Sequence, residues 1–320
     1  MKFEKPVLLM VVDTEEEFDW SAPPSREATG VGAMRRLERG QRIADEYGIK
    51  PVYVADYPVV SQTDGWKPLY EFFQSGRCEI GTHVHPWVNP PFEEDLTPRN
   101  TYMGNLPAAL EREKLRVTTA VIAERLGQPP KVYKAGRYGI GPNSAGILAE
   151  LGYEVDLSTA PPFNYTADGG PDFSGHEPDC YWWTSEPEIL EIPTTGAFVG
   201  RWQRNADRLY AWAASGWREA ARMPGILSRL GVIDRLRLSP EQYSPAEHRK
   251  LTRFLIDRGV RVFTFSFHST SLDPGRNDYV RTQSDLDRFL DSFRGYFDYF
   301  FGDLGGVTMT ASEVRRQMKL

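Results

Sequence analysis

Short apolar runs and amphipathic stretches alternate through residues 1–160 of the chain. Pro6–Val12 is a continuous apolar run that ends in acidic residues, which is typical of a buried parallel strand. Val31–Tyr47 has apolar residues three and four positions apart and is followed by Gly48, which predicts a helix and its end. Further predicted strands are Pro51–Ala55, Cys78–Val84, Lys131–Ala135 and Tyr153–Leu157, and further predicted helices are Trp66–Phe73, Pro107–Leu126 and Asn143–Leu151. This alternation predicts a parallel sheet, open or closed into a barrel.

Residues 158–245 interrupt this regular pattern. They contain Pro161–Pro162, the aromatic run Tyr181–Trp183 and a helical tract near Ala206–Leu230. The regular pattern then returns with predicted helices at Pro245–Arg258 and Ser284–Phe301 and predicted strands at Val260–Phe267 and Gly306–Met309. We therefore predict one domain over residues 1–320, with an irregular insertion at about 158–245.

Composition and charge exclude several classes of protein. The 320 residues are 40% hydrophobic and 26% charged, which is ordinary for a globular protein. The net charge is −6 and the basic residues are dispersed, so nucleic acid is not an expected partner. No stretch approaches the ~20 apolar residues of a membrane span, and the run Val7–Val12 is too short for a signal peptide. Two cysteines make no disulfide framework, so we expect a reduced, cytoplasmic protein without a membrane partner, either monomeric or a homodimer.

Two acidic residues follow the first predicted strand directly. Asp13 and Glu15 share one face, because side chains alternate along a strand. Two carboxylates so close repel each other unless a cation or a shared proton lies between them. The pattern is typical either of an acidic loop or of one carboxylate that holds a metal beside another that acts as a base.

Two histidines lie two residues apart at the end of the Cys78–Val84 strand. His83 and His85 share one face, and the chain has only five histidines. Imidazole is a common ligand of zinc and similar ions, so this pair is a candidate for metal binding. Trp87 follows them, either as a stacking platform for a sugar ring or as a core residue.

Two further strand ends carry charged side chains. Lys134 and Arg137 lie around Gly136, where they would orient a carboxylate or bind an acidic substrate. His268 follows the Val260–Phe267 strand, as a general acid or as a histidine bonded to the hydroxyl residues after it. The carboxyl ends of parallel strands meet at one edge, so together these groups suit hydrolysis of an amide or ester by metal-activated water. The chain lacks the glycine-rich nucleotide motifs and the G-x-S-x-G of serine hydrolases.

In the order of these motifs the chain resembles the polysaccharide deacetylase superfamily, which includes carbohydrate esterase family 4. The resemblance runs through Asp13-Thr14-Glu15, Glu79–His83, Tyr133–Gly139 and the strand ending at His268. It implies an α/β fold, a distorted (β/α) barrel of about seven parallel strands, with the insertion on the substrate side of a catalytic domain. It also implies that Asp13 is the general base, that Glu15 and His83 bind a metal, and that His268 is the general acid.

The chain departs from the family pattern at three positions. Glu15 stands where the family has Asp, and Trp87 stands where the family has its second histidine, so His85 becomes the expected third ligand. Lys134 stands where the family has the arginine that orients the base, and Arg137 is the alternative for that task. The expected cofactor is a divalent ion, Zn²⁺ first, with Mn, Co or Ni as alternatives. The expected substrate-binding aromatic residues are Trp87, Tyr138, Trp182 and Trp183.

Three functions follow from this interpretation. The first is a metal-dependent hydrolase that removes an acyl group, in the first place N-acetyl, from an amino sugar, a related carbohydrate or a small molecule. The second is a metal-independent amidohydrolase, similar to allantoinase, that acts on a small C–N substrate, because some relatives with altered ligands work without metal. The third is a non-catalytic carbohydrate-binding protein on the same fold.

Overall fold

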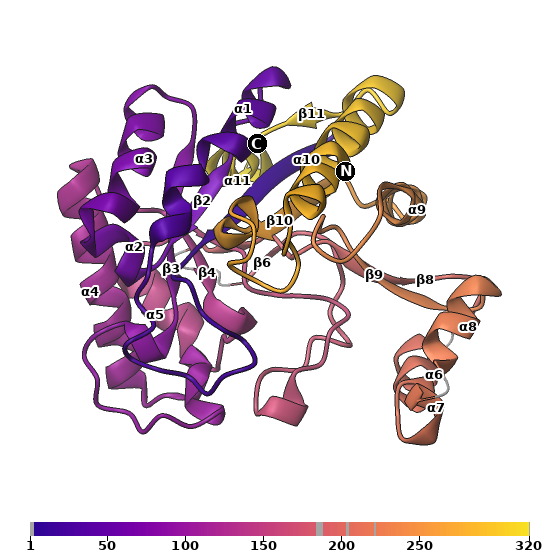
Figure 1. The fold of residues 1–320 in the computed structure, drawn as a ribbon, viewed down its shortest axis with the longest axis horizontal. Helices are drawn as coiled ribbons and strands as arrows, with labels where there is room; N and C mark the ends of the chain where they lie inside the picture. Colours follow the sequence, from indigo (N-terminus) through magenta and orange to yellow (C-terminus); the bar gives the residue numbers. More distant parts are fainter. Residues whose placement is uncertain (1–2, 184–187, 203–204, 221, 320) are drawn as a thin grey trace.

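A curled, mostly parallel sheet forms the centre of the computed structural model, which describes residues 3–183, 188–202, 205–220 and 222–319 (Figure 1). Its strands are β1 (Val7–Thr14), β2 (Val52–Ala55), β3 (Glu79–Val84), β4 (Val132–Ala135), β5 (Val155–Asp156), β6 (Tyr181–Trp182), β7 (Leu190–Glu191), β10 (Val262–His268) and β11 (Val307–Thr308). The hydrogen-bonded order is β10-β1-β2-β3-β4-β5-β7-β6, and β11 also pairs with β1. Within the described residues every pair from β10 to β7 is parallel, and only β6 runs antiparallel. The predicted distorted barrel is confirmed.

Side-chain hydrogen bonds bridge the gap between the two edges of this sheet. The amide N of Thr195, after β7, donates to Oγ1 of Thr264 at 2.7 Å, and the amide N of Thr264 donates to Oγ1 of Thr195 at 2.8 Å. Higher on β10, the amide of Ser266 donates to the carbonyl oxygen of Leu238 at 3.2 Å. Hydrogen bonds from main-chain amides to two threonine hydroxyls therefore stand where a regular sheet would have hydrogen bonds between main-chain groups, and the barrel is distorted at this point.

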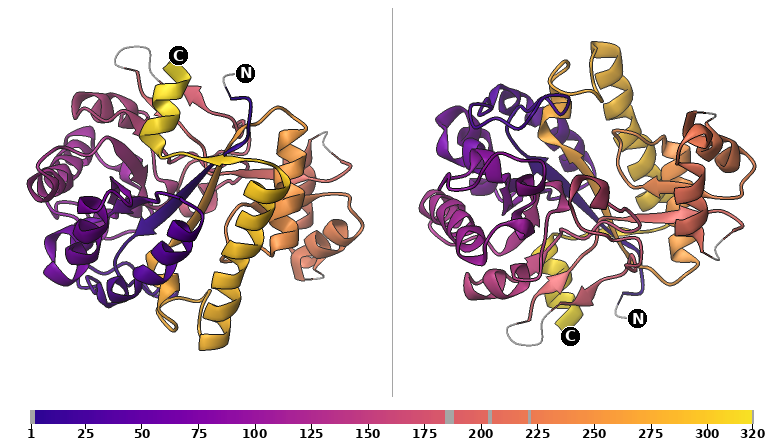
Figure 2. Two further views of the ribbon diagram at one scale, coloured as in Figure 1. Left: turned by 90° about the horizontal axis from the view of Figure 1, so that it is seen from above. Right: turned by 90° about the horizontal axis from the view of Figure 1, so that it is seen from below.

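Helices cover the outside of the sheet on both sides of β1 (Figure 2). The helices of the first half are α1 (Glu38–Glu46), α2 (Tyr57–Ser61), α3 (Thr63–Gln74), α4 (Ala108–Leu126) and α5 (Ser144–Glu150), and those of the second half are α9 (Pro245–Ile256), α10 (Gln283–Phe297) and α11 (Ala311–Lys319). The predicted helix Val31–Tyr47 is divided into a 3₁₀ turn, Gly32–Arg36, and α1, while α10 continues into a π-helix at Asp298–Asp303. No described helix has the length and apolar character needed to cross a membrane.

The alternation of side chains along β1 divides the core into an outer and an inner layer. Leu8, Met10 and Val12 pack against the surrounding helices, whereas Val7, Leu9 and Val11 pack inside the barrel. Ala311 and Val314 of α11 join this inner cluster and close the end of the barrel where the strands begin. The next inward position on β1 after Val11 is Asp13, so the interior changes from apolar to polar towards the carboxyl ends of the strands.

The 158–245 segment contains its own small hairpin. Strands β8 (Gly196–Val199) and β9 (Asp234–Arg237) pair antiparallel. The connection between them projects away from the sheet (Figure 1) and carries three short helices, α6 (Ala206–Ala213), α7 (Trp217–Ala220) and α8 (Met223–Arg229), in place of the one helical tract that the sequence predicts. The remainder of the segment returns to the sheet, where it brings side chains to the carboxyl ends of the strands.

Candidate functional site

Strand register brings four of the predicted site residues to one end of the barrel. Asp13 on β1 lies opposite His268 on β10, and His83 on β3 lies opposite Lys134 on β4. Because the strands are parallel and start together, their inward positions line up at the carboxyl edge. A pocket of about 250 Å³ opens there. The residues lining it are Asp13, Glu15, Trp20, His83, His85, Tyr102, Ala135, Arg137, Tyr138, Tyr165, Asp168, Arg237, His268 and Tyr279.

Asp13 is held by a buried lysine. The Nζ atom of Lys134 lies 2.6 Å from Oδ1 and 2.7 Å from Oδ2 of Asp13. Burial by itself would raise the pKa of Asp13, but the lysine charge and the neighbouring histidines outweigh burial and lower it. Nε2 of His268 lies 3.9 Å from Oδ2 on the same carboxylate. Asp13 is thus an ionised carboxylate beside a histidine, which suits proton transfer.

Glu15, His83 and His85 converge on one point. Oε2 of Glu15 lies 3.6 Å from Nε2 of His83 and 3.6 Å from Nε2 of His85, and all three side chains are buried. Nδ1 of His83 donates to the carbonyl oxygen of Lys134 at 2.9 Å, so its Nε2 carries the lone pair. That buried Nε2 has no hydrogen-bond partner in the described part of the chain.

The convergent atoms fit a divalent ion. One atom from each of the three residues lies within 4.8 Å of the others. Two imidazoles with one carboxylate form a ligand set that Zn²⁺ and similar first-row ions accept, with positions left for water and substrate. The unpaired Nε2 of His83 is a buried lone pair that an ion would satisfy, since burial without a partner is costly. His85 therefore lies where a third ligand is needed.

Glu16 and Asp56 support His85 from outside the ligand set. Nδ1 of His85 bonds to Oε2 of Glu16 at 2.8 Å, and the amide of Glu16 donates to Oδ2 of Asp56 at 2.9 Å. Asp56 also caps α2 by accepting from the amide of Val59 at 2.9 Å. Burial raises the pKa of Glu16 to about 8 and that of Asp56 well above its ordinary value. A partner on the second nitrogen fixes the ring orientation of a metal-binding histidine. The contact of Glu16 with His85 could not be predicted from the alternation of side chains along the strand, because that alternation places Glu16 on the opposite face from Asp13 and Glu15.

Two residues pack directly on the ring of His85. Trp87 stacks on it with ring centroids 4.3 Å apart and planes 14° from parallel. A Cβ atom at position 136 would overlap Cδ2 of His85, so only glycine, directly after β4, lets the chain approach this ring so closely. His85 thus has one fixed position, between an indole ring and a glycine.

Glu241 is the partner of His268. Its carboxylate accepts from the amide N of His268 at 2.9 Å, and its Oε2 lies 2.9 Å from Nδ1 of the same residue. Ser271 donates to it at 2.6 Å. Burial disfavours a charged His268, but the charges of Glu241 and Glu15 outweigh burial and raise its pKa to about 10. Glu241 could not be predicted from the sequence, because it lies in the irregular segment with no periodic pattern around it.

Lys134, and not Arg137, is the cation that contacts Asp13. Arg137 extends to the rim instead, where it donates to Oγ1 of Thr101 at 2.5 Å and to Asp168 at 3.2 Å. Arg137 and Tyr138 both have left-handed backbones, with φ of 54° and 59°. Such a conformation costs on the order of 1–3 kcal/mol per non-glycine residue and is concentrated at functional sites. Here it turns the chain so that both side chains line the pocket.

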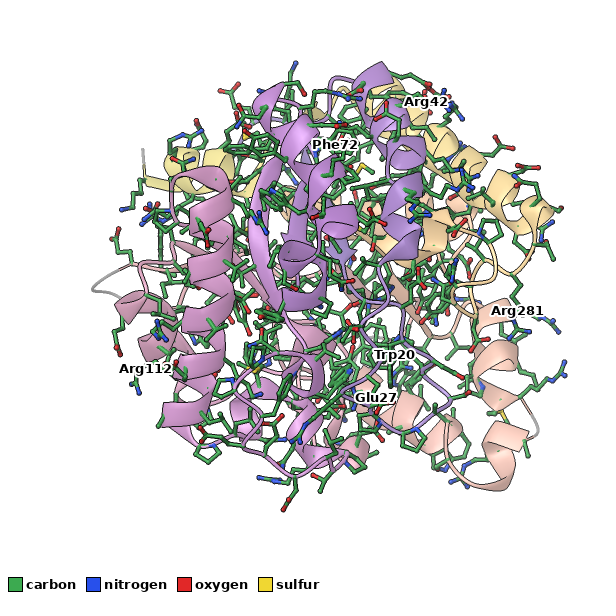
Figure 3. The ribbon with its side chains drawn as sticks, turned by 60° about the vertical axis from the view of Figure 1, so that its left-hand side comes forward. Trp20, Glu27, Arg42, Phe72, Arg112 and Arg281 are labelled. Carbon is green, nitrogen blue, oxygen red and sulfur yellow. The ribbon has the colours of Figure 1, made fainter. Side chains whose placement is uncertain are left out.

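The aromatic wall of the pocket differs from the predicted one. Tyr138 lines the pocket, but Trp87 is only 1% exposed and lies under His85, so it has no free face for a sugar. Trp182 packs against the inner core near α11, and Trp183 packs against the cluster beneath α5. None of these three tryptophans lines this pocket in the described structure, and each packs against other side chains. The wall is formed instead by Trp20, Tyr102, Tyr138, Tyr165 and Tyr279. Trp20, on the loop after β1, is labelled in Figure 3.

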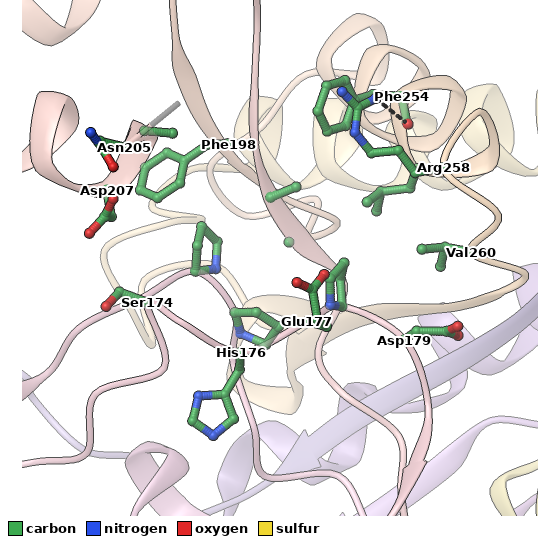
Figure 4. Close-up of a pocket in the computed structure, with 17 residues that line it drawn as sticks. Ser174, His176, Glu177, Asp179, Phe198, Asn205, Asp207, Phe254, Arg258 and Val260 are labelled. Atoms are coloured by element: carbon green, nitrogen blue, oxygen red, sulfur yellow. Dashed lines mark hydrogen bonds between the residues drawn. The ribbon is translucent and has the colours of Figure 1, made fainter. Parts of the chain in front are cut away.

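A larger hollow lies elsewhere on the protein. Its described side chains form no cluster like that of Glu15, His83 and His85. It measures about 540 Å³ and lies between the 158–245 segment and α9 (Figure 4). Asp207 and Asp179 lie on opposite sides of it in this view, and the one hydrogen bond drawn joins Arg258 to the carbonyl oxygen of Phe254. Asp156, another strand-end acid, is fully buried and bonded to Ser158, away from both openings. We therefore assign the candidate site to the smaller pocket.

Solved structures share this fold. A protein assigned as a polysaccharide deacetylase from Mycobacterium smegmatis is 16% identical, with a TM-score of 0.55 over 99% of this chain and 93% of that one. A protein assigned likewise from Pseudomonas aeruginosa PAO1 is 14% identical, with a TM-score of 0.51 over 97% and 90%. The Puue allantoinase is 14% identical, with a TM-score of 0.50 over 97% and 89%. No family model and no curated protein matches the sequence. The chain has the polysaccharide deacetylase fold.

Proposed function

We propose that this protein is a metal-dependent hydrolase that removes an acyl group, in the first place N-acetyl, from an amino sugar or a related carbohydrate. The observation that carries the proposal is the convergence of Glu15, His83 and His85 beside Asp13 and His268. A ligand set, a base and an acid in one pocket match the requirements of amide hydrolysis. Aromatic rings along the wall support a carbohydrate, because Tyr and Trp have flat apolar faces with a polar edge.

Asp13 is the general base of the proposed reaction. Its carboxylate takes a proton from the attacking water, and Lys134 holds it ionised and aimed through two contacts. Glu15, His83 and His85 would hold a divalent ion, which when bound would supply Lewis-acid polarisation of the acyl carbonyl and would make water more acidic. Glu16, through Nδ1 of His85, keeps that ring turned towards Glu15.

His268 is the general acid. Glu241 keeps its imidazole protonated and oriented, so that Nε2 faces the pocket beside Asp13. When the C–N bond breaks, Nε2 gives its proton to the leaving nitrogen, which departs as a neutral amine. The proton taken by Asp13 restores His268, and the net reaction is amide plus water to amine plus carboxylic acid.

Metal content tests the ligand set. Wild-type protein purified without chelator or affinity nickel should contain about one divalent ion per chain by elemental mass spectrometry. His85→Ala should lose most of that ion, because only two ligands remain, whereas His176→Ala, an exposed histidine in the second hollow, should keep it. Deacetylation of N-acetyl amino sugars should stop after chelation and return when metal is added. Activity that survives exhaustive chelation would instead favour the metal-independent amidohydrolase, and retained metal in His85→Ala would remove this residue from the ligand set.

Substrate comparison tests the acid. His268→Ala should lower kcat on an N-acetyl amino sugar by about 10²-fold or more, because an amine is a poor leaving group without a proton. The same variant should lose much less on p-nitrophenyl acetate, since nitrophenolate leaves unprotonated. Initial rates on both substrates, with metal content measured in parallel, give the comparison. Equal losses on amide and ester would argue against the acid role.

A further inference from the structure

Arg237 is a cation of the pocket that the proposed reaction does not use. It ends β9 and lines both the main pocket and a small side cavity that also touches Asp13 and His268. Its Nη1 donates to the hydroxyl of Tyr138 at 3.0 Å and its Nη2 to the hydroxyl of Tyr165 at 2.6 Å. Its Nε is buried and has no hydrogen-bond partner among the residues that the structure describes. Within the described chain no carboxylate comes within 4.0 Å of this guanidinium group.

Each carboxylate that lines these two cavities has a partner of its own. Asp13 is held by Lys134, and Glu15 faces the two histidines. The other two acids are Asp168, which pairs with Arg137, and Glu241, which bonds to His268 and Ser271. Arg237 therefore keeps a positive charge with only neutral partners. A partly buried cation without a counter-charge is unfavourable, and it favours binding of an anion from outside.

The surroundings hold Arg237 rigidly. Its guanidinium carbon lies 3.9 Å from the ring centre of Phe163 and 4.8 Å from that of Tyr138. Tyr138 stacks on Tyr165 with centroids 5.6 Å apart. The rings of Phe163 and Tyr138 and the tyrosine hydroxyls thus fix the plane of the Arg237 guanidinium group. The N–H groups of a guanidinium match the spacing of carboxylate and phosphate oxygens.

The ring of Tyr138 lies beside Arg237 and also beside Lys134, the lysine that contacts Asp13. Nζ of Lys134, which contacts Asp13, lies 5.2 Å from the Tyr138 ring centre, and Arg237 lies 4.8 Å from the same centre. Both cations therefore lie next to the same aromatic ring. A sugar with its acyl group at Asp13 would bring another substituent of its ring towards Arg237.

We propose that Arg237 binds an anionic group on the substrate, so that the protein acts on an acidic acylated sugar, with a carboxylate or a phosphate. This proposal rests on the proposed function for the acyl group, but the anion site itself can be tested by binding alone. Arg235 provides a matched control. It lies two residues earlier on β9, packs on Phe163 and Tyr210, and does not line the pocket.

The test is titration calorimetry at low ionic strength. The probes are N-acetylglucosamine, its 1-phosphate, its 6-phosphate and N-acetylglucosaminuronic acid, so that phosphate and carboxylate are distinguished. Wild type should bind at least one anionic probe about 10- to 100-fold more tightly than the neutral sugar, as expected for a charge-assisted hydrogen bond. Arg237→Met should lose this preference, Arg237→Lys should keep part of it, and Arg235→Met should keep all of it.

Two results would overturn the proposal. One is a wild type that binds the neutral sugar as tightly as every anionic probe, and the other is an unchanged preference in Arg237→Met. Arg237→Lys keeps the charge and most of the packing, so it separates loss of the anion site from loss of folding, which thermal unfolding checks. Deacetylation is measured in parallel on the same probes. An anion preference that depends on Arg237, without any turnover, would refute the proposed function and keep the anion site.

Discussion

Asp13→Asn is expected to lower kcat on an N-acetyl amino sugar by at least about 10³-fold, within the range assigned to general acid–base catalysis. The amide of Asn has the shape of the carboxylate and its oxygen can still accept from Lys134, but it cannot take a proton from water. Bound metal should stay at the wild-type level, because Asp13 is not among the three convergent ligands. Turnover and elemental mass spectrometry on the same preparation measure the two effects.

Asp64→Asn is the control for this substitution. Asp64 is an exposed surface acid paired with Arg35, so its replacement should change neither turnover nor metal content. Asp13→Asn with near-normal turnover would exclude Asp13 as the base. Loss of metal together with turnover would make Asp13 a ligand instead of a base.

Lys134→Met is expected to destabilise the fold by about 3–5 kcal/mol and to lower kcat by about 10²-fold or more, because it leaves a buried carboxylate without its cation. Lys134 and Asp13 are both buried, and each oxygen of the carboxylate contacts the ammonium. Without that charge, burial would raise the pKa of Asp13 and weaken its role as an ionised base. Urea unfolding at pH 8 gives the stability difference, and initial rates give the activity.

Arg137→Met is the matched control at the other cation of the same loop. Arg137 pairs with Asp168, which is largely exposed, so its loss should cost at most about 1 kcal/mol. Asp13 has a lowered pKa in the folded protein, so its pair with Lys134 stabilises the fold above the ordinary pKa of 3.8 and stops doing so as the pH falls through the folded value. The difference between wild type and Lys134→Met should therefore shrink in acid. A larger loss for Arg137→Met would reverse the assignment of the two cations.

Local patterns in the sequence predicted the barrel and the residues at its strand ends. Asp13, His83, Lys134 and His268 each follow or end an apolar run, and parallel strands bring such positions to one edge whatever the details of the loops. The two-residue period of a strand is sufficient for this prediction. It could also pair Asp13 with Glu15, but it could not decide between Lys134 and Arg137, because that depends on two left-handed residues after β4.

The rest of the site depends on contacts between distant parts of the chain. Glu241 meets His268 across 27 residues, and Arg237 meets Tyr138 across 99, from a segment without regular period. The sequence also left two alternatives for Trp87. An indole after two histidines fits a sugar platform or the core equally well by sequence, and only packing against His85 decides between them.

The residues that line the pocket come from separate parts of the sequence. The residues proposed as ion ligands and as base come from the first 134 residues, while Tyr165, Asp168 and Arg237 of the pocket wall come from the 158–245 segment. That segment joins the barrel through the Thr195–Thr264 bonds and the β5–β7 pairing, and it reaches the pocket through Glu241, which bonds to His268. Exchange of the loops that carry Tyr165 and Asp168, with Glu241 kept in place, would therefore alter which molecules are accepted while it preserves the residues of the proposed reaction, which makes this scaffold well suited to the evolution and engineering of new substrate preferences.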